Sequence, residues 1–161
     1  MKKIITTLLS KKSFLAAIFS AISIGILSTL TFNTPYGIFL LASFGATVVL
    51  LFGYPESPFA QPKNIFFGHI ATTLIGLIFL KIGIFPEYLS IPLAVGVGVG
   101  VMMAMKITHP PAGGNPIIVI SGGASFDFLV FPVILGTLII IGSGIIFNRY
   151  IAKINYPHLK N

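Results

Sequence analysis

The sequence predicts an all-α membrane protein, and three observations support this. Of its 161 residues, 55% are hydrophobic and only 8% are charged, whereas a soluble domain carries about a quarter charged residues. The mean hydropathy is +1.02. Several apolar runs are about 20 residues long, the length at which a helix crosses the roughly 30 Å hydrocarbon core of a bilayer. We therefore expect one transmembrane domain, residues 1–161, with four full transmembrane helices and two short, interrupted or re-entrant segments.

The four full helices are predicted from the length and apolar character of their segments. Residues 13–32 and 128–147 each form a run of 20 residues. Residues 65–80 and 89–105 are shorter, but their flanking residues can extend them. A basic stretch before the first run is also the pattern of a cleaved signal peptide. The length of this run, with further apolar runs behind it, favours a spanning helix.

Two apolar segments are too short or too broken to be full helices. Residues 36–52 contain the run Ser43-Phe44-Gly45-Ala46-Thr47, and residues 112–120 follow the run His109-Pro110-Pro111. A helix of nine residues reaches about 14 Å, roughly half a membrane. We therefore predict a re-entrant half-helix after the prolines and a helix break at Ser43–Thr47.

The segments repeat in the same order. A full helix, a short interrupted segment and a full helix are predicted at about residues 13–84 and again at about residues 88–148. Interrupted segments in matching positions of two repeats are typical of the midplane site of a transporter. Within residues 89–105, Gly96 and Gly100 form a pair of small residues four apart, which predicts close helix packing. Pore lining is the alternative for this pair.

The charges lie at the ends of the apolar segments. Ten Lys and Arg residues against three Asp and Glu residues give a net charge of +7. The basic residues that flank the first and last helices are Lys2, Lys3, Lys11, Lys12, Arg149, Lys153 and Lys160. The positive-inside rule then predicts a multi-pass protein of the cell (inner) membrane with both termini cytoplasmic and residues 149–161 as a basic cytoplasmic tail. This pattern is not a nucleic-acid surface.

Cytoplasmic termini require an even number of crossings, and six spans satisfy this as well as four. In the four-span topology Lys81 lies inside and Lys106 outside, and in the six-span topology the two exchange sides. With one lysine on each side in both cases, the positive-inside rule does not distinguish the topologies. The short segment at residues 112–120 favours four spans because nine residues cannot cross the bilayer.

The break after His109 has the features of an anion site. Proline suits the first turn of a helix. The N–H groups of Ala112, Gly113 and Gly114 are then predicted to point outward from a helix start, where the dipole is positive. A tight loop that merely reverses the chain is the alternative.

Several polar side chains lie close to this break or to the matching one. Lys106 precedes His109 by three residues, and His69 lies one turn inside the third apolar segment. Both histidines could relay protons near neutral pH, and an interhelical hydrogen bond is the alternative for His69. Gln61, Lys63 and Asn64 form a polar approach to that segment.

Enzyme chemistry is not predicted. The chain has no cysteine and three acidic residues in separate loops, and it has no cluster with metal-ligand spacing. We therefore expect no catalytic residue, no metal and no cofactor.

The sequence resembles the HPP family of small integral membrane proteins. The resemblance rests on His109-Pro110-Pro111-Ala112-Gly113-Gly114 and on the stretch from Phe44 to His69, which includes Pro55-Glu56-Ser57-Pro58 and Gln61-Pro62-Lys63-Asn64. It implies a four-helix membrane protein whose cyanobacterial and plastid relatives are implicated in nitrite transport. It also implies that Lys63, Lys106 and His69 occupy family positions. This chain departs at Gly114-Asn115-Pro116, where the family usually has a small residue, Thr and Ala.

These observations together predict a transporter or channel for a small inorganic anion, with nitrite as the family-based candidate. Four helices are few to enclose a transport pathway, so we also expect a homo-oligomer. The expected partners are the lipid bilayer and the anion, with no nucleic acid. The alternatives are a non-transporting membrane scaffold or assembly subunit, in which the breaks serve packing, and an enzyme completed by a partner. The predicted substrate-binding residues are His109, Pro110, Pro111, Ala112, Gly113, Gly114, Asn115, Ser43, Gly45, Ala46, Thr47, Lys106, Lys63, Gln61, Asn64 and His69.

Overall fold

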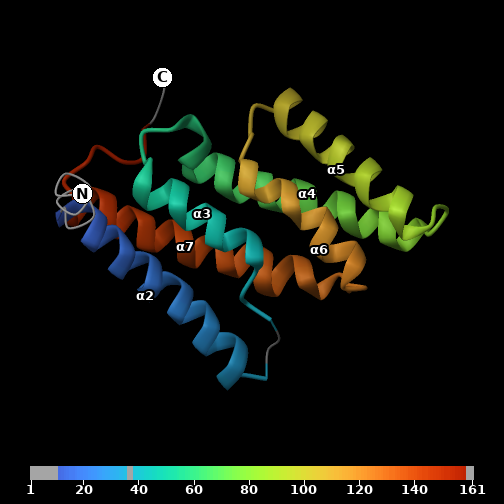
Figure 1. Ribbon diagram of the computed structural model, residues 1–161, viewed down its shortest axis with the longest axis horizontal. Helices are drawn as coiled ribbons and strands as arrows, with labels where there is room; N and C mark the ends of the chain where they lie inside the picture. Colours follow the sequence, from blue (N-terminus) through green and yellow to red (C-terminus); the bar gives the residue numbers. More distant parts are fainter. Residues whose placement is uncertain (1–10, 36–37, 159–161) are drawn as a thin grey trace, which may run out of the picture.

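The structure, a computed structural model, describes residues 11–35 and 38–158, and within these ranges the chain is helical without strands. The helices are α2 (Lys11–Asn33), α3 (Ala42–Gly53), α4 (Pro62–Ile82), α5 (Glu87–Ala104), α6 (Asn115–Ser121) and α7 (Gly136–Ile145), shown in Figure 1. Two 3₁₀ turns, η1 (Pro58–Ala60) and η2 (Pro110–Gly114), precede α4 and α6. Wider π-helical turns, η3 (Leu129–Leu135) and η4 (Ile146–Ile151), extend α7 at both ends.

The four predicted spans are confirmed. The helices long and apolar enough to cross a membrane are Lys11–Asn33, Pro62–Ile82, Glu87–Ala104 and Leu129–Ile151. The short helices α3 and α6 have 12 and 7 residues, which corresponds to about 18 Å and about 11 Å at 1.5 Å per residue. Neither length crosses a bilayer, so the short helices fit the four-span prediction and not the six-span alternative.

The helix break predicted at Ser43–Thr47 is wrong in position. Helix α3 begins at Ala42 and runs without interruption to Gly53, and the chain leaves its helical path before it, at Leu41, which is extended with φ −114° and ψ 141°. No proline lies within α3 to remove a backbone donor, and one glycine inside a helix costs only about 1 kcal/mol. The run of small residues therefore stays helical.

The two short helices begin near the middle of the molecule and run toward opposite ends (Figure 1). Helix α3 contacts η2, which leads directly into α6. Each short helix is followed by a full span, so the order full, short, full occurs twice along the chain. This is the order that the sequence predicts.

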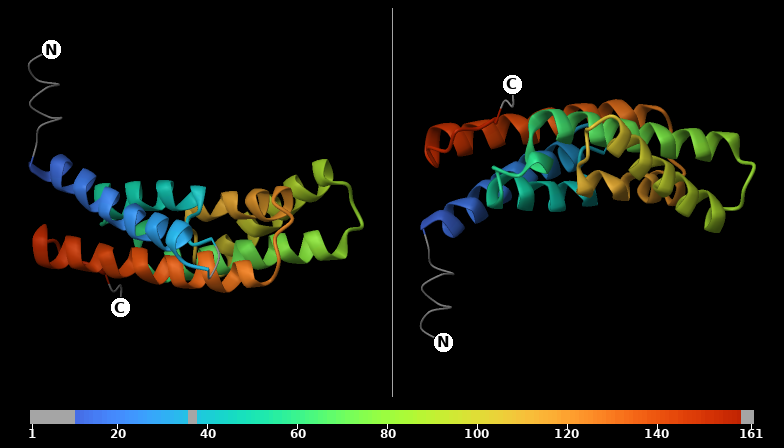
Figure 2. Two further views of the ribbon diagram at one scale, coloured as in Figure 1. Left: turned by 90° about the horizontal axis from the view of Figure 1, so that it is seen from below. Right: turned by 90° about the horizontal axis from the view of Figure 1, so that it is seen from above.

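Helix α4 is the packing centre of the molecule. It contacts α5, α6, α7 and η3, while α2 packs on α3 and α7; Figure 2 shows the same neighbours from two further sides. Glycines permit the closest approaches. A Cβ at Gly76 would lie 2.9 Å from the Cα of Pro116, and one at Gly98 would lie 3.3 Å from a Thr72 methyl carbon.

The packing predicted for Gly96 and Gly100 is not found within the described part of the chain. Neither glycine has a heavy atom within 4 Å of an added Cβ, and both are exposed. Gly98, on the opposite face of α5, makes the close contact instead. The Gly96 and Gly100 face therefore points away from the helix bundle.

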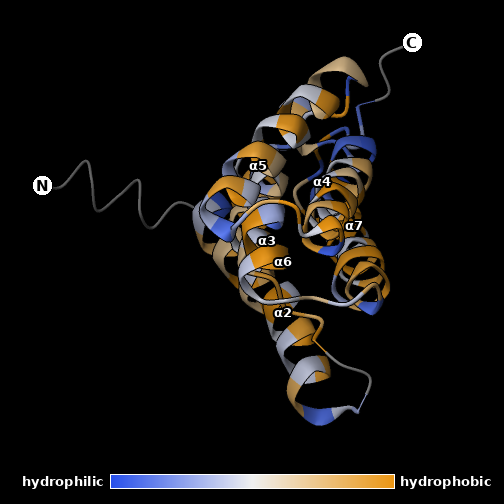
Figure 3. Cartoon of the chain, turned by 90° about the vertical axis from the view of Figure 1, so that its right-hand side faces the viewer, coloured by the Kyte–Doolittle hydropathy of each residue, from blue (hydrophilic) through white to orange (hydrophobic). Residues whose placement is uncertain are grey.

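The outward faces of the spans are apolar (Figure 3). Helix α2 exposes Phe14, Ile18, Ile22 and Ile26, which recur at helical spacing. Such a continuous apolar stripe would be an aggregation hazard in water, but it matches hydrocarbon. A buried apolar core lies behind it and includes Leu27, Phe44, Leu51, Ile65, Ile140 and Phe147.

The close contact between α4 and α6 generates a prediction. The change Gly76→Ala should lower the unfolding temperature by several degrees, because the new methyl group would press against the Pro116 backbone and against the Val119 Cβ at 3.1 Å. Overpacking of this kind costs about 1–3 kcal/mol. Gly96→Ala is the matched control, since its methyl group meets open space. Size-exclusion profiles of heated, detergent-purified protein measure both, and equal unfolding temperatures for the two variants would contradict the described α4–α6 packing.

Candidate functional site

A cluster of buried polar side chains lies where α3, α4 and η2 meet. Thr47 of α3, His69 of α4, His109 at the start of η2 and Asn115 at the start of α6 each have 0% of their surface exposed. Polar groups at membrane depth are costly unless they are paired. The partners of these four side chains therefore define the site.

Local sequence explains how His109 enters the cluster. It precedes two prolines and has the extended conformation, φ −135° and ψ 99°, to which a residue before proline is restricted. Gly68 leaves the space that the histidine occupies: a Cβ on Gly68 would lie 2.9 Å from the His109 Cβ and 3.1 Å from the Ile107 carbonyl oxygen. The glycine before His69 thus lets the second histidine approach the first.

One threonine hydroxyl joins the two histidines. The Thr47 Oγ1 lies 3.0 Å from the His69 Nε2 and 3.0 Å from the His109 Nε2. The two imidazole rings are 5.0 Å apart between centroids. Thr47 also lies 3.1 Å from the Ser43 carbonyl oxygen, one turn earlier in α3.

The other nitrogen of each imidazole is also paired. The His109 Nδ1 donates to the Phe59 carbonyl oxygen at 2.7 Å. The Asn115 Nδ2 lies 2.9 Å from the His69 Nδ1, 3.2 Å from the His69 carbonyl oxygen and 3.0 Å from the Thr73 Oγ1. All four imidazole nitrogens of the cluster therefore have a partner.

Two oxygens near the cluster have no partner among the described residues. They are the Ser43 Oγ and the Asn115 Oδ1, and both side chains are buried. An unpaired buried acceptor is rare in native structures and marks a place where a small polar guest gains hydrogen bonds.

The structure brings together part of the predicted site. The buried cluster contains Thr47, His69, His109 and Asn115, with Ser43 and Ala112 buried next to it. Asn64 joins the start of α4 to the loop before His109 by donating to the Thr108 carbonyl oxygen at 2.9 Å. The remaining residues of the η2 turn, Pro110, Pro111, Gly113 and Gly114, are exposed or half-buried.

Other predicted residues lie outside the cluster. Lys63, Lys106, Gly45 and Ala46 are exposed, and neither lysine side chain makes a hydrogen bond or an ion pair within the described ranges. The half-buried Gln61 donates to the Pro55 and Ser57 carbonyl oxygens, both at 2.9 Å. Gln61 therefore stabilises the loop before α4 without reaching the histidines.

The predicted outward-pointing donors at the helix start are not all free. The Ala112 N–H donates to the His109 carbonyl oxygen at 3.0 Å inside the 3₁₀ turn. The Asn115 N–H closes the turn on the Ala112 carbonyl oxygen. Because the turn is tighter than an α-helix, it uses these donors internally.

Sequence reasoning missed two partners of the site, Thr73 and the Phe59 carbonyl, and two tail contacts that stabilise the loop before α4. Thr73 lies four residues after His69, and this helical spacing places both side chains on one face, so it could have been found. The Phe59 carbonyl carried no signal, because any residue has one. The contacts of residues 152–158, which follow the last helix, gave no signal in the sequence either. The Tyr156 hydroxyl donates to the Ala60 carbonyl oxygen at 2.7 Å, and the His158 N–H donates to the Gln61 Oε1. Burial raises the pKa of the Tyr156 hydroxyl, so it remains a donor.

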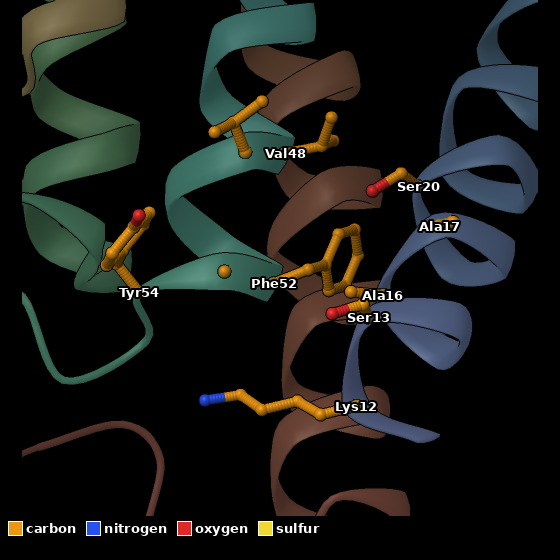
Figure 4. Close-up of a pocket in the computed structure, with 10 residues that line it drawn as sticks. Lys12, Ser13, Ala16, Ala17, Ser20, Val48, Phe52 and Tyr54 are labelled. Carbon is orange, nitrogen blue, oxygen red and sulfur yellow. The ribbon is translucent and has the colours of Figure 1, made fainter. Parts of the chain in front are cut away.

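A cavity of about 450 Å³ lies elsewhere, between α2 and α3. Figure 4 shows Lys12 extending across its mouth below Phe52, with Tyr54 on the far side and Ala16 on α2. None of the predicted site residues lines it. Among the described residues, no group of three or more His, Cys, Asp or Glu side chains is placed to hold a metal ion.

Four apolar spans around a buried His–Thr–His cluster define a multi-pass helical membrane protein with an ionisable centre. The chain belongs to the HPP family: its residues 6–157 match the HPP transmembrane region. This confirms the resemblance seen in the sequence.

Two transmembrane proteins of Dictyostelium discoideum are similar to the chain. One is 30% identical over 125 residues, which is 73% of this chain and 44% of the relative. The other is 34% identical over 127 residues, which is 74% of this chain and 41% of the relative. The chain therefore spans less than half the length of either relative. No solved structure matches it.

The cluster generates a prediction about stability. The change Asn115→Ala should lower the free energy of unfolding by about 1–3 kcal/mol, because it strips His69 and Thr73 of a buried donor. Asn33→Ala is the control. Asn33 also donates to a backbone carbonyl, but at an exposed position, and should change the free energy by less than about 0.5 kcal/mol. Thermal unfolding in one detergent compares them, and a destabilisation equal to that of the control would contradict the pairing described for Asn115.

Proposed function

We propose that the protein is a transporter or channel for a small inorganic anion, with nitrite as the family-based candidate. The observation that carries this proposal is the pair of fully buried imidazoles, His69 and His109, in a bundle of membrane-spanning helices. Ionisable residues inside a membrane protein are expensive to bury and usually mark a path for ions or substrate.

The position of the cluster supports a transport role. It lies where two short helices start from the middle of the molecule (Figure 1). In transporters, helices interrupted at membrane depth provide polar groups at the substrate site, because non-helical backbone there is tolerated only where protein or a polar cavity surrounds it. The unpaired Ser43 hydroxyl lies in the same region and can donate to an anion, whereas the unpaired Asn115 Oδ1 only accepts.

An anion at this site needs a positive charge beside it. Burying an unpaired charge in an apolar environment is very costly, and every Lys and Arg residue in the described part of the chain is exposed, away from the buried cluster. A protonated His69 or His109 supplies that charge together with N–H donors. The cluster is fully buried, so the described arrangement corresponds to an occluded state that must open for the anion to pass.

The exposed Lys63 and Lys106 act in this proposal at a distance. They raise the local concentration of anions near the ends of α4 and α5, an effect that salt screens over about 8 Å at physiological ionic strength. The proposal also includes residence in the inner membrane, cytoplasmic termini and assembly as a homo-oligomer.

Flux through proteoliposomes tests the proposal. With a panel of small anions that includes nitrite, His109→Ala should lower the initial rate at least tenfold, because the cluster loses one of its two chargeable groups. Lys106→Ala should cause a smaller fall that disappears at high salt. Lys153→Ala, in the exposed tail, is the control and should leave the rate unchanged. Unchanged anion flux in both His109→Ala and Lys106→Ala would contradict the proposed transport mechanism.

A non-transporting scaffold is the second candidate, and one observation favours it. Every imidazole nitrogen of the cluster is already paired inside the protein, as a packing device requires. This alternative expects no flux of any anion from a folded, reconstituted wild-type protein, and it expects His109→Ala to reduce thermal stability alone.

A further inference from the structure

We infer that the buried cluster is a one-proton relay, in which His69, Thr47 and His109 pass a proton through two imidazoles and one hydroxyl. This inference rests on the proposed function, because it makes the proton the ion that moves with the anion. It goes further by assigning a role to each nitrogen and a definite polarity to the chain of hydrogen bonds.

The partners at the two ends of the chain fix the polarity. An amide nitrogen only donates, so the His69 Nδ1, 2.9 Å from the Asn115 Nδ2, accepts. The orientation of this amide follows from its second contact, since the His69 carbonyl oxygen at 3.2 Å requires a donor. A neutral His69 therefore carries its proton on Nε2 and donates it to Thr47.

The other end has the opposite arrangement. The Phe59 carbonyl oxygen only accepts, so the His109 Nδ1 at 2.7 Å carries the proton. The His109 Nε2 then accepts, and Thr47 is its donor. The two neutral histidines are thus opposite tautomers, and the hydroxyl between them accepts from one and donates to the other.

A proton can cross this chain of hydrogen bonds by a series of transfers in which each bond that breaks is matched by a bond that forms. When the site opens, water that displaces the Asn115 amide from the His69 Nδ1 delivers a proton to that nitrogen. The ring becomes cationic, and the Nε2–H bond then breaks as its proton moves to the Thr47 Oγ1. The original hydroxyl proton of Thr47 moves to the His109 Nε2, which makes His109 the cation. The His109 Nδ1–H bond then breaks as water on the side of the Phe59 carbonyl takes the proton, since the carbonyl itself only accepts a hydrogen bond. One proton enters and one leaves, no electron moves, and both rings and the hydroxyl must reorient before the next passage.

The surroundings isolate this path. Around the two histidines, α3 contributes Ser43 and Phe44, η1 contributes the Phe59 carbonyl, and α6 contributes Asn115, and none of these titrates. The charged residues nearest in sequence, Glu56, Lys63 and Lys106, are exposed. A proton on the cluster therefore has only the two histidines to occupy among the described side chains.

Thr47 also provides a switch in the path. Its single hydroxyl proton has two acceptors, the His109 Nε2 at 3.0 Å and the Ser43 carbonyl oxygen at 3.1 Å. Rotation toward Ser43 interrupts the relay, and rotation toward His109 completes it. A role in packing alone does not need the hydroxyl to face both rings.

The test compares two substitutions at Thr47 in the full-length protein. Thr47→Ser keeps the hydroxyl, and Thr47→Val keeps the shape and removes it. Proteoliposomes that enclose a pH-sensitive dye receive external nitrite at neutral pH, and the signal of protein-free vesicles is subtracted. Wild type and Thr47→Ser should move protons together with nitrite, whereas Thr47→Val should lose at least nine-tenths of the proton movement. Proton movement in Thr47→Val equal to that of wild type would overturn the relay.

A second measurement separates failure of the relay from failure of anion transport. Nitrogen NMR of ¹⁵N-histidine-labelled protein in bilayers reports which ring nitrogen carries the proton. The relay expects opposite neutral tautomers, Nε2–H for His69 and Nδ1–H for His109, and the same tautomer at both positions would overturn it. If wild type carries no anion while the tautomers are opposite, the anion proposal and its coupling to the proton fail, whereas the hydrogen-bond polarity assigned to the cluster stands.

Discussion

Polar groups inside a bilayer have no water to pair with, and this constraint shapes the centre of the molecule. Two short helices leave non-helical backbone near the middle of the helix bundle, and each unpaired group in an apolar environment there would cost several kcal/mol. The tight η2 turn uses its own donors, and the cluster of Thr47, His69, His109 and Asn115 pairs side chains across α3, α4, η2 and α6. The same hydrogen bonds that make the interruption tolerable also create an ionisable centre.

Close helix packing is a consequence of that centre. Hydrogen bonds of 3.0 Å between α3, α4 and η2 require the backbones to approach closely, and a side chain at the crossing would hold them apart. Gly68 leaves room for His109, and Gly76 lets Pro116 touch α4. Small residues are the usual means of close approach in membranes. Here they lie on either side of His69, so packing and polar pairing use the same face of α4.

The sequence predicted the spans well and the site only in part. Span length follows from hydrophobic thickness, which is a local property, and all four spans lie where the apolar runs predict them. The run of small residues at Ser43–Thr47 predicts an interruption that α3 does not have, because nothing in this run prevents a helix. His69 and His109 are 40 residues apart, and their meeting depends on how α4 packs against η2, which no local pattern reveals. Lys63 and Lys106 were grouped with them by charge, but long basic side chains gain more from remaining in water.

The orientation of His109 depends on the loop that precedes α4. The Phe59 carbonyl accepts the Nδ1 proton of His109, so this carbonyl determines which tautomer of His109 the protein contains. Phe59 belongs to η1, where Ser57 accepts the Phe59 N–H at 3.2 Å and the C-terminal Tyr156 holds the Ala60 carbonyl. The Gln61 side-chain amide stabilises the same loop, because it donates to the Pro55 and Ser57 carbonyl oxygens. A loop secured from both sides keeps its carbonyl directed at the histidine. This is how contacts at the membrane surface fix the protonation pattern of a ring buried in the bundle.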